Sequence, residues 1–182
     1  MADHYGVRNS FYHRSGRTAV IGEHEGTISI PEHSHLGAWM NQRARGLGAT
    51  DSAPVSTGGE ENLLCHNNDR YRHEDIFLHE FAHAVSNIGA AHTISGWKQR
   101  LESQYNTAKS RGLWANTYSM TDSAEYFVSK MILKYINVKL PYSCVCVCKC
   151  VRTGVYMCLL RTPCRLPCSV RLQFDNLALH FI

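Results

Sequence analysis

The chain has 182 residues, 44% of them hydrophobic and 19% charged, which is the composition of a globular protein large enough for one domain. Its net charge of +4 is unevenly distributed: residues 1–127 carry 11 Lys and Arg against 14 Asp and Glu, whereas residues 128–182 carry 8 against Asp175 alone. The basic charge belongs to the C-terminal segment, so nucleic-acid binding by the remainder is not indicated. No apolar run of about 18 residues predicts a membrane span, and no signal peptide is visible after Met1.

The first third of the chain predicts little regular structure. Residues 1–17 are polar, and we expect a loosely ordered N-terminus. Two short strands are predicted at 18–22 and 26–31, the second an edge strand because Pro31 ends it. Residues 37–60 are rich in Gly, Ala and Ser, and we expect a loop region that carries a short strand or lines a cleft. The histidines beside the strands are predicted to be isolated surface residues: His24, His33 and His35.

The most informative segment is His79-Glu80-Phe81-Ala82-His83. Two histidines four residues apart lie on one face of a helix, so both imidazoles can reach one zinc ion. Glu80 faces the same cleft and can accept a proton from a water molecule bound to that ion. Asp75 is a suitable N-cap and Gly89 a suitable C′ residue. The apolar side of this helix comprises Ile76, Ala82, Val85 and Ile88.

Two further helices are predicted downstream. The first begins near Ser95 and ends at Arg111-Gly112, and its apolar stripe predicts core packing: Trp97, Leu101, Tyr105 and Ala108. The other begins at Asp122, which is a good N-cap. Glu125 lies three residues later, in the position that a capping-box glutamate occupies.

A catalytic zinc site usually has three protein ligands and one open position, so a third ligand is required. The downstream candidates are His92, Asp122 and Glu125. Glu125 would be held on a rigid helix, which favours a ligand, but a capping role would explain the same residue without a metal. Spacing alone leaves both interpretations open.

A resemblance adds to this. The segment from His79 to Phe127 resembles zinc metallopeptidases with a glutamate third ligand, above all the catalytic core of the anthrax lethal-factor type. In those proteins HExxH is followed by a Tyr, a polar turn and a Glu-aromatic-aromatic helix start. Here the sequence is Tyr118-Ser-Met-Thr-Asp-Ser-Ala-Glu125-Tyr-Phe127. Uncharacterised secreted members from fungi, bacteria and invertebrates are more similar still, because they carry versions of three further segments: Arg43-Ala-Arg-Gly-Leu-Gly48, Glu60-Glu-Asn-Leu-Leu-Cys65 and Gly112-Leu-Trp-Ala-Asn-Thr-Tyr118.

The resemblance covers roughly residues 18–127 and implies an α+β, zincin-like fold. It implies Zn²⁺ as the cofactor, with His79, His83 and Glu125 as its ligands. Glu80 would be the general base, and Tyr118 would donate a hydrogen bond to the oxyanion of the tetrahedral intermediate. A protein or peptide substrate would pair with the edge strand near residues 26–30. An extracellular location is implied as well.

The resemblance stops at Phe127. In the relatives an Ala-Glu-Gly sequence continues the last helix, and its glutamate supports the site, whereas this chain continues with Val128-Ser129-Lys130. From there the composition changes to a basic segment that includes Cys144-Val-Cys-Val-Cys-Lys-Cys150. A soft-metal thiolate site would be one interpretation. We favour translation of an intron, because alternating Cys and Val is what a TG-dinucleotide repeat encodes.

The sequence therefore predicts a zinc endopeptidase domain at residues 18–127, incomplete on its C-terminal side, and a poorly ordered tail at 128–182. The alternative prediction is a metal- or peptide-binding remnant that has lost turnover because its third helix is truncated after Phe127.

Overall fold

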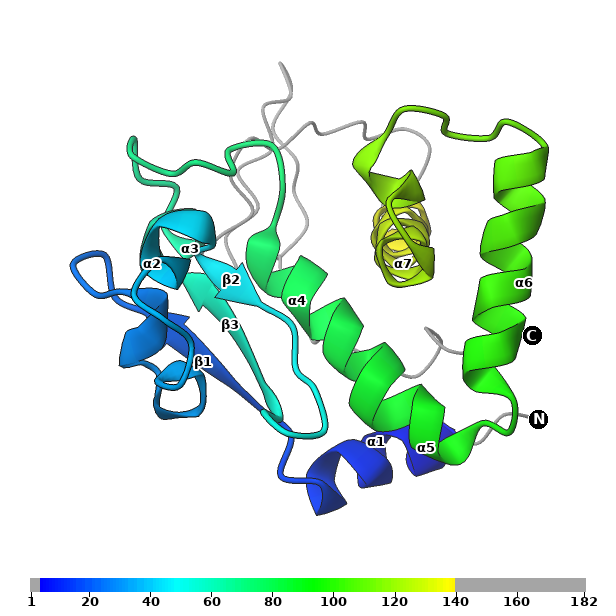
Figure 1. Cartoon of the computed structure of the whole chain (residues 1–182), viewed down its shortest axis with the longest axis horizontal. Helices are drawn as coiled ribbons and strands as arrows, with labels where there is room; N and C mark the ends of the chain where they lie inside the picture. The colour runs from blue at the N-terminus through cyan, green and yellow to red at the C-terminus, as the bar shows by residue number, and fades with distance from the viewer. Residues whose placement is uncertain (1–3, 140–182) are drawn as a thin grey trace, which may run out of the picture.

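The structure is a computed structural model that describes residues 4–139, with side chains described for residues 5–133. Within residues 4–139 the fold is α+β, as predicted, with a small mixed sheet and several helices. The sheet lies on one side of helix α4 (Ile76–Ala84), and helices α6 (Trp97–Ser110) and α7 (Ser123–Lys139) lie on the other (Figure 1). None of the helices in this part of the chain is long and apolar enough to cross a membrane.

The sheet of the described residues has three strands in the order β1-β3-β2. Strand β1 (Arg17–Ile21), close to the first predicted strand, pairs in parallel with the central strand β3 (Val55–Gly59). Strand β2 (Gly46–Leu47) pairs with β3 in the antiparallel direction and forms the other edge. The region expected to be mainly a loop thus contains two of the three strands, together with the short helix α2 (Met40–Arg43).

Glycines allow α4 to lie close to the sheet. Gly46 and Gly58 are directly paired across β2 and β3. A Cβ atom at Gly46 would collide with Ile76 of α4, and one at Gly58 would lie 2.6 Å from Phe77 of the same helix. Only residues without a side chain fit this contact, so β2 and the motif helix are in direct contact.

The second predicted strand is wrong. Residues 26–31 do not join the sheet but form two 3₁₀ turns, Thr27–Ser29 and Pro31–His33. Side chains satisfy groups that a strand would use for pairing: Asn41 accepts the Ile28 N–H at 3.0 Å, and the buried Thr27 hydroxyl donates to Ala44. Pro31 occupies the first position of a turn, where its missing N–H costs nothing.

The expectation of a loosely ordered N-terminus is also wrong, because His4–His13 form helix α1. This helix packs against a π-helical segment, Val85–Ala90, that continues α4, and against the short helix α5 (Ala91–Thr93). The predicted role of Gly89 as a helix C-cap is wrong for the same reason. A Cβ at Gly89 would lie 2.6 Å from Val7, so the glycine serves the close approach of α1.

The predictions for α6 and α7 agree with the structure. Gly112, with φ +64°, follows α6, and all four residues of the predicted α6 stripe are buried. They join the largest hydrophobic cluster of the described residues, which α7 completes with Tyr126, Phe127, Val128 and Met131. Helix α7 does not end at Phe127 but continues to Lys139, so the prediction of a poorly ordered tail is wrong for residues 128–139. Residues 140–182, which include the predicted cysteine-rich tail, lie outside the described residues.

Candidate metal centre

Helix α4 carries the motif and begins as predicted. The Asp75 carboxylate accepts the Leu78 N–H at 2.9 Å, which satisfies one of the free donors at the helix start. Ile76, Ala82 and Ile88 are buried, so the apolar side of α4 and its π-helical continuation is fixed against the core. The helix therefore holds His79 and His83 in a defined orientation.

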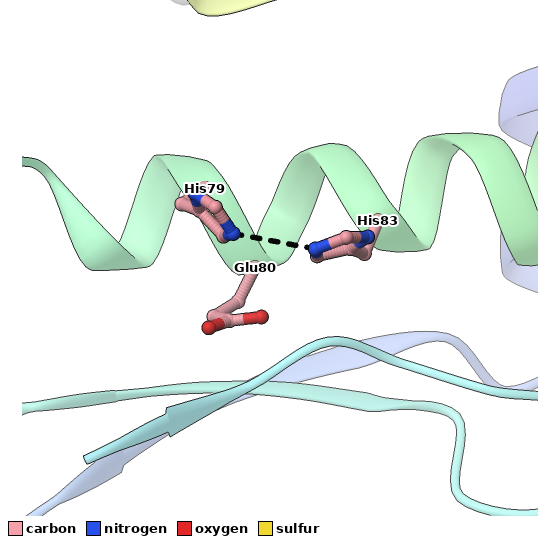
Figure 2. Close-up of side chains that lie close together, drawn as sticks. All are labelled: His79, Glu80 and His83. Atoms are coloured by element: carbon pink, nitrogen blue, oxygen red, sulfur yellow. Dashed lines mark hydrogen bonds between the residues drawn. The ribbon is translucent and has the colours of Figure 1, made fainter. Parts of the chain in front are cut away.

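The two histidines meet a carboxylate from α7. The Nε2 atoms of His79 and His83 lie 3.3 Å apart, and Figure 2 shows the rings turned toward one another on the same face of α4. Glu125 places Oε2 at 3.2 Å from His79 Nε2 and Oε1 at 3.4 Å from His83 Nε2. Glu125 thus lies 46 positions after His79 in the sequence, yet the donor atoms of all three residues converge toward one point.

Glu125 is not acting as a capping glutamate. Asp122 alone supplies the N-cap of α7, because its Oδ1 accepts the N–H groups of Ala124 and Glu125, both at 2.9 Å. The carboxylate of Glu125 is directed to the histidines instead. The choice that the sequence left open is therefore decided by geometry in favour of a residue that contacts the histidines.

The spacing of these atoms fits a metal ion. Two atoms that bind one zinc ion at roughly 2.0–2.1 Å with tetrahedral angles lie about 3.3–3.4 Å apart, close to the observed separations. Glu125 Oε2 is also buried without a hydrogen-bond partner in the part of the chain that the structure describes. A buried carboxylate oxygen without a hydrogen bond is costly unless a cation or another donor binds it, so the donor set suits a divalent metal.

The charges of the cluster are strongly coupled. Burial lowers the pKa of His79, but the carboxylates of Glu125 and Glu74 outweigh this effect and raise it to about 10. Burial raises the pKa of Glu125, but the imidazoles of His79 and His83 reverse this and lower it to about 2. In the metal-free protein a proton thus takes the place of a cation beside Glu125, and a metal that binds here displaces it.

Glu80 projects from α4 beside the two histidines but in a different direction (Figure 2). Figure 2 shows its carboxylate pointing away from the imidazoles toward the strands. His79, Glu80 and His83 each offer one donor atom, and these atoms lie within 4.8 Å of one another, so this group could also hold a metal ion. Glu125 is the better candidate for a third ligand, because one of its oxygens lies 3.2 Å from His79 Nε2 and the other 3.4 Å from His83 Nε2. Burial raises the pKa of Glu80 to about 7, which leaves it able to exchange a proton near neutral pH.

Tyr118 stands at the open side of the cluster. It begins a 3₁₀ turn, Tyr118–Met120, and its side chain is exposed while its hydroxyl lies 3.4 Å from Glu125 Oε1. Two contacts hold this turn: the Tyr105 hydroxyl donates to the carbonyl of Met120 at 3.0 Å, and the hydroxyls of Ser119 and Ser129 are 2.7 Å apart. Partial burial and the charge of Glu125 raise the pKa of Tyr118, so the phenol keeps its proton and remains a donor.

The other candidates lie elsewhere. His92 is 2.7 Å from Asp51, away from the cluster, and Asp122 caps α7. His24 and His35 are exposed as predicted, but His33 is only 3% exposed, so the prediction of a surface residue is wrong there. Sequence reasoning missed Glu74, whose Oε1 lies 2.7 Å from His79 Nδ1. Its position five residues before His79 carries no known motif, so only the fold of the preceding loop reveals it.

No protein-family model matches this chain, and neither the curated proteins nor the solved structures contain a significant match.

Proposed function

We propose that this chain is a zinc-dependent endopeptidase with a zincin-like catalytic domain. The observation that carries the proposal is the convergence of His79, His83 and Glu125 with separations suited to one tetrahedral ion, and with one buried carboxylate oxygen left without a hydrogen bond. Zinc held by such ligands makes a water molecule acidic and polarises a carbonyl group. The resemblance in sequence supports zinc and peptide hydrolysis among the reactions open to such a site, and it is the only support for an extracellular location.

The residues of the chain have distinct roles in this proposal. Glu80, with its pKa raised to about 7, accepts a proton from the attacking water and returns it to the leaving nitrogen. Tyr118 keeps its phenolic proton and donates a hydrogen bond to the oxyanion as it forms. Because the Tyr118 side chain is exposed, a substrate carbonyl would be able to reach its hydroxyl.

In this proposal strand β2, and not residues 26–30, pairs with an extended substrate. It is an edge of the sheet, and no strand of the described residues pairs with its outer side. It also contacts the site: a Cβ at Gly46 would lie 3.1 Å from Glu80 Cγ, and one at Gly48 would lie 2.5 Å from His83. An extended peptide that adds to this edge would place its backbone beside Glu80 and His83.

The first test is the zinc content of the purified full-length chain, measured by elemental analysis beside Glu125→Ala. We expect one zinc per wild-type chain and a marked loss in the variant, with Glu102→Ala, an exposed α6 residue, as the control. Zinc that Glu125→Ala leaves unchanged would contradict the three-ligand site, and a wild-type chain without zinc would contradict the proposed function.

The second test separates hydrolysis from binding. Glu80→Gln should retain zinc and lose cleavage of unstructured peptides by about 10²–10⁴-fold, because the amide cannot accept the proton. Wild-type protein that binds zinc and cleaves no peptide would favour the alternative of a metal-binding remnant without turnover.

A further inference from the structure

The second ring nitrogen of His79 has a dedicated partner. His79 Nδ1 lies 2.7 Å from Glu74 Oε1, a length typical of a charge-assisted hydrogen bond. The imidazole side chain is only 7% exposed, whereas the Glu74 side chain is 43% exposed. When Nδ1–H donates to Glu74, Nε2 is left to face His83 and Glu125. Histidines that bind metals commonly use their other N–H in this way, and the contact fixes both tautomer and ring orientation.

Glu74 has no helix of its own to hold it, since it precedes the N-cap of α4. The residue that holds its backbone is Asn62, in the short helix α3 (Glu60–Leu63). The Asn62 amide Nδ2 lies 3.1 Å from the Glu74 carbonyl and 3.3 Å from that of Tyr71, and Asn62 Oδ1 accepts the Ile76 N–H at 3.0 Å. One side chain therefore fixes the backbone on both sides of Glu74.

Asn62 is itself firmly fixed. It is 1% exposed, and its Nδ2 also lies 3.0 Å from Asp69 Oδ2, while Asp69 Oδ1 accepts the Tyr71 N–H at 2.8 Å. Its neighbour Glu61 forms a buried, two-point ion pair with Arg45, with both N–O distances 2.7 Å. The loop at residues 69–75 is thus attached to a rigid, buried polar network rather than to solvent.

We propose that Glu74 is a positioning residue that orients His79 for metal binding, and that Asn62 acts on the metal through Glu74. This inference rests on the proposed metal site and adds residues that lie outside the HExxH motif. The metallopeptidases that this sequence resembles have a supporting glutamate after the position of Phe127, and this chain lacks it. Here a carboxylate reaches the site from the loop before α4 instead.

The test is the Zn²⁺ dissociation constant of the full-length chain, measured by competition with a chromophoric chelator. Glu74→Gln keeps the shape and an acceptor but removes the charge, and it should weaken zinc binding by about 10–100-fold. Glu102→Gln, the same exchange at an exposed position of α6, should leave the constant unchanged. Because Glu74 is half exposed, the variant should fold, and an unchanged constant would overturn the inference.

A spectroscopic readout separates positioning from stability. In the zinc-bound protein, the ¹H resonance of His79 Nδ1–H should lie far downfield and should move upfield in Glu74→Gln. Asn62→Asp removes the amide N–H groups that donate to the backbone carbonyls of Glu74 and Tyr71. It should shift the same resonance and weaken zinc binding. Its effect should largely vanish in the Glu74→Gln background, because both changes act on one contact.

If Asn62→Asp does not fold, Asp69→Asn tests the same attachment with a smaller change. The effects of Glu74→Gln and of Asn62→Asp (or Asp69→Asn) on the zinc dissociation constant should not add fully in the double variant. Full additivity would overturn the role of Asn62. A wild-type chain that binds no zinc would refute the proposed function, and with it the metal role of Glu74. Wild-type zinc binding with an unaffected Glu74→Gln would refute the inference alone.

Discussion

The loop that precedes α4 connects two largely buried polar clusters, and they differ in one respect. The α3 cluster comprises Arg45, Glu61, Asn62 and Asp69, and the histidine cluster comprises His79, His83 and Glu125. In the α3 cluster the charges are paired at hydrogen-bond distance, and Arg45 also donates to the carbonyls of Gly22 and Glu25. In the histidine cluster Glu125 Oε2 is buried and makes no hydrogen bond within the described residues, although His79 Nε2 lies 3.2 Å from it.

The difference indicates which cluster is complete by itself and which one a bound ion would complete. Buried polar groups that satisfy one another stabilise one conformation, whereas an arrangement with an open acceptor is costly unless a ligand completes it. Burial alone does not distinguish the clusters, since Glu61 is 5% and His79 6% exposed. The clusters differ in whether every buried carboxylate oxygen has a hydrogen-bond partner.

The largest expected effect lies in the α3 cluster. Arg45→Ala leaves Glu61 buried without its cation, and it should lower the free energy of unfolding by about 3–5 kcal/mol in urea denaturation. Arg43→Ala, two residues earlier and exposed, should change it by less than about 0.5 kcal/mol. Equal changes in the free energy of unfolding for the two variants would show that the buried ion pair does not stabilise the fold.

The histidine cluster should contribute to stability mainly when metal is present. Zinc at 100 times its dissociation constant should stabilise the wild-type chain by about 2.7 kcal/mol, and a chelator should reverse this. His83→Ala should abolish the zinc-dependent shift in melting temperature. A shift that persists in His83→Ala would place the stabilising ion at another site.

Acid should weaken the α3 cluster in a defined direction. Burial raises the pKa of Glu61, but the hydrogen bond from Arg45 outweighs it and lowers the pKa below the ordinary value of 4.5. The stability that Glu61 contributes is therefore fully present above pH 4.5 and is lost as the pH falls below it. The difference in the free energy of unfolding between wild type and Glu61→Gln, measured by urea denaturation and up to about 2 kcal/mol near pH 7, should shrink below pH 4.5. A difference that is constant with pH would contradict this assignment.

The smallest effects concern the starts of the two helices that carry the proposed metal ligands. Asp75→Ala at α4 and Asp122→Ala at α7 each remove a carboxylate that accepts backbone N–H groups. Each should cost about 1 kcal/mol in urea denaturation of the metal-free protein. Asp122→Asn, which keeps an acceptor, should recover most of that loss, and failure to recover it would argue against a capping role.

The parts of the fold that the sequence predicts are those with strong local signals. Asp75 and Asp122 cap their helices, and the α6 stripe is buried as its spacing requires. The central strand was missed because Val55–Gly59 is buried at every position and consists largely of small residues, so no alternation is visible. Residues 26–31 show the opposite failure, because their β-branched residues resemble a strand while Asn41, distant in sequence, satisfies the Ile28 N–H.

The residues of the candidate site that lie on helices were predictable from the sequence. The two histidines followed from their spacing, and Glu125 entered the site through the resemblance, since spacing left a capping role open. Glu74 could not be predicted, because its contact with His79 depends on a loop whose path is fixed by Asn62. Side chains brought into place by long-range hydrogen bonds leave no periodic trace in a sequence.

The contact between α1 and the far end of the motif helix has a practical consequence for handling the protein. Ser10 donates to the carbonyl of Ile88 at 2.7 Å, and the rings of Phe11 and Phe81 meet edge to face. The link from α1 to β1 passes through exposed Arg14 and through Ser15, which has a φ of +56°. Trypsin that cuts after Arg14 would free α1, and preparations cleaved there would lose the packing of α1 against the Val85–Ala90 segment while nearly all of the chain's mass remained.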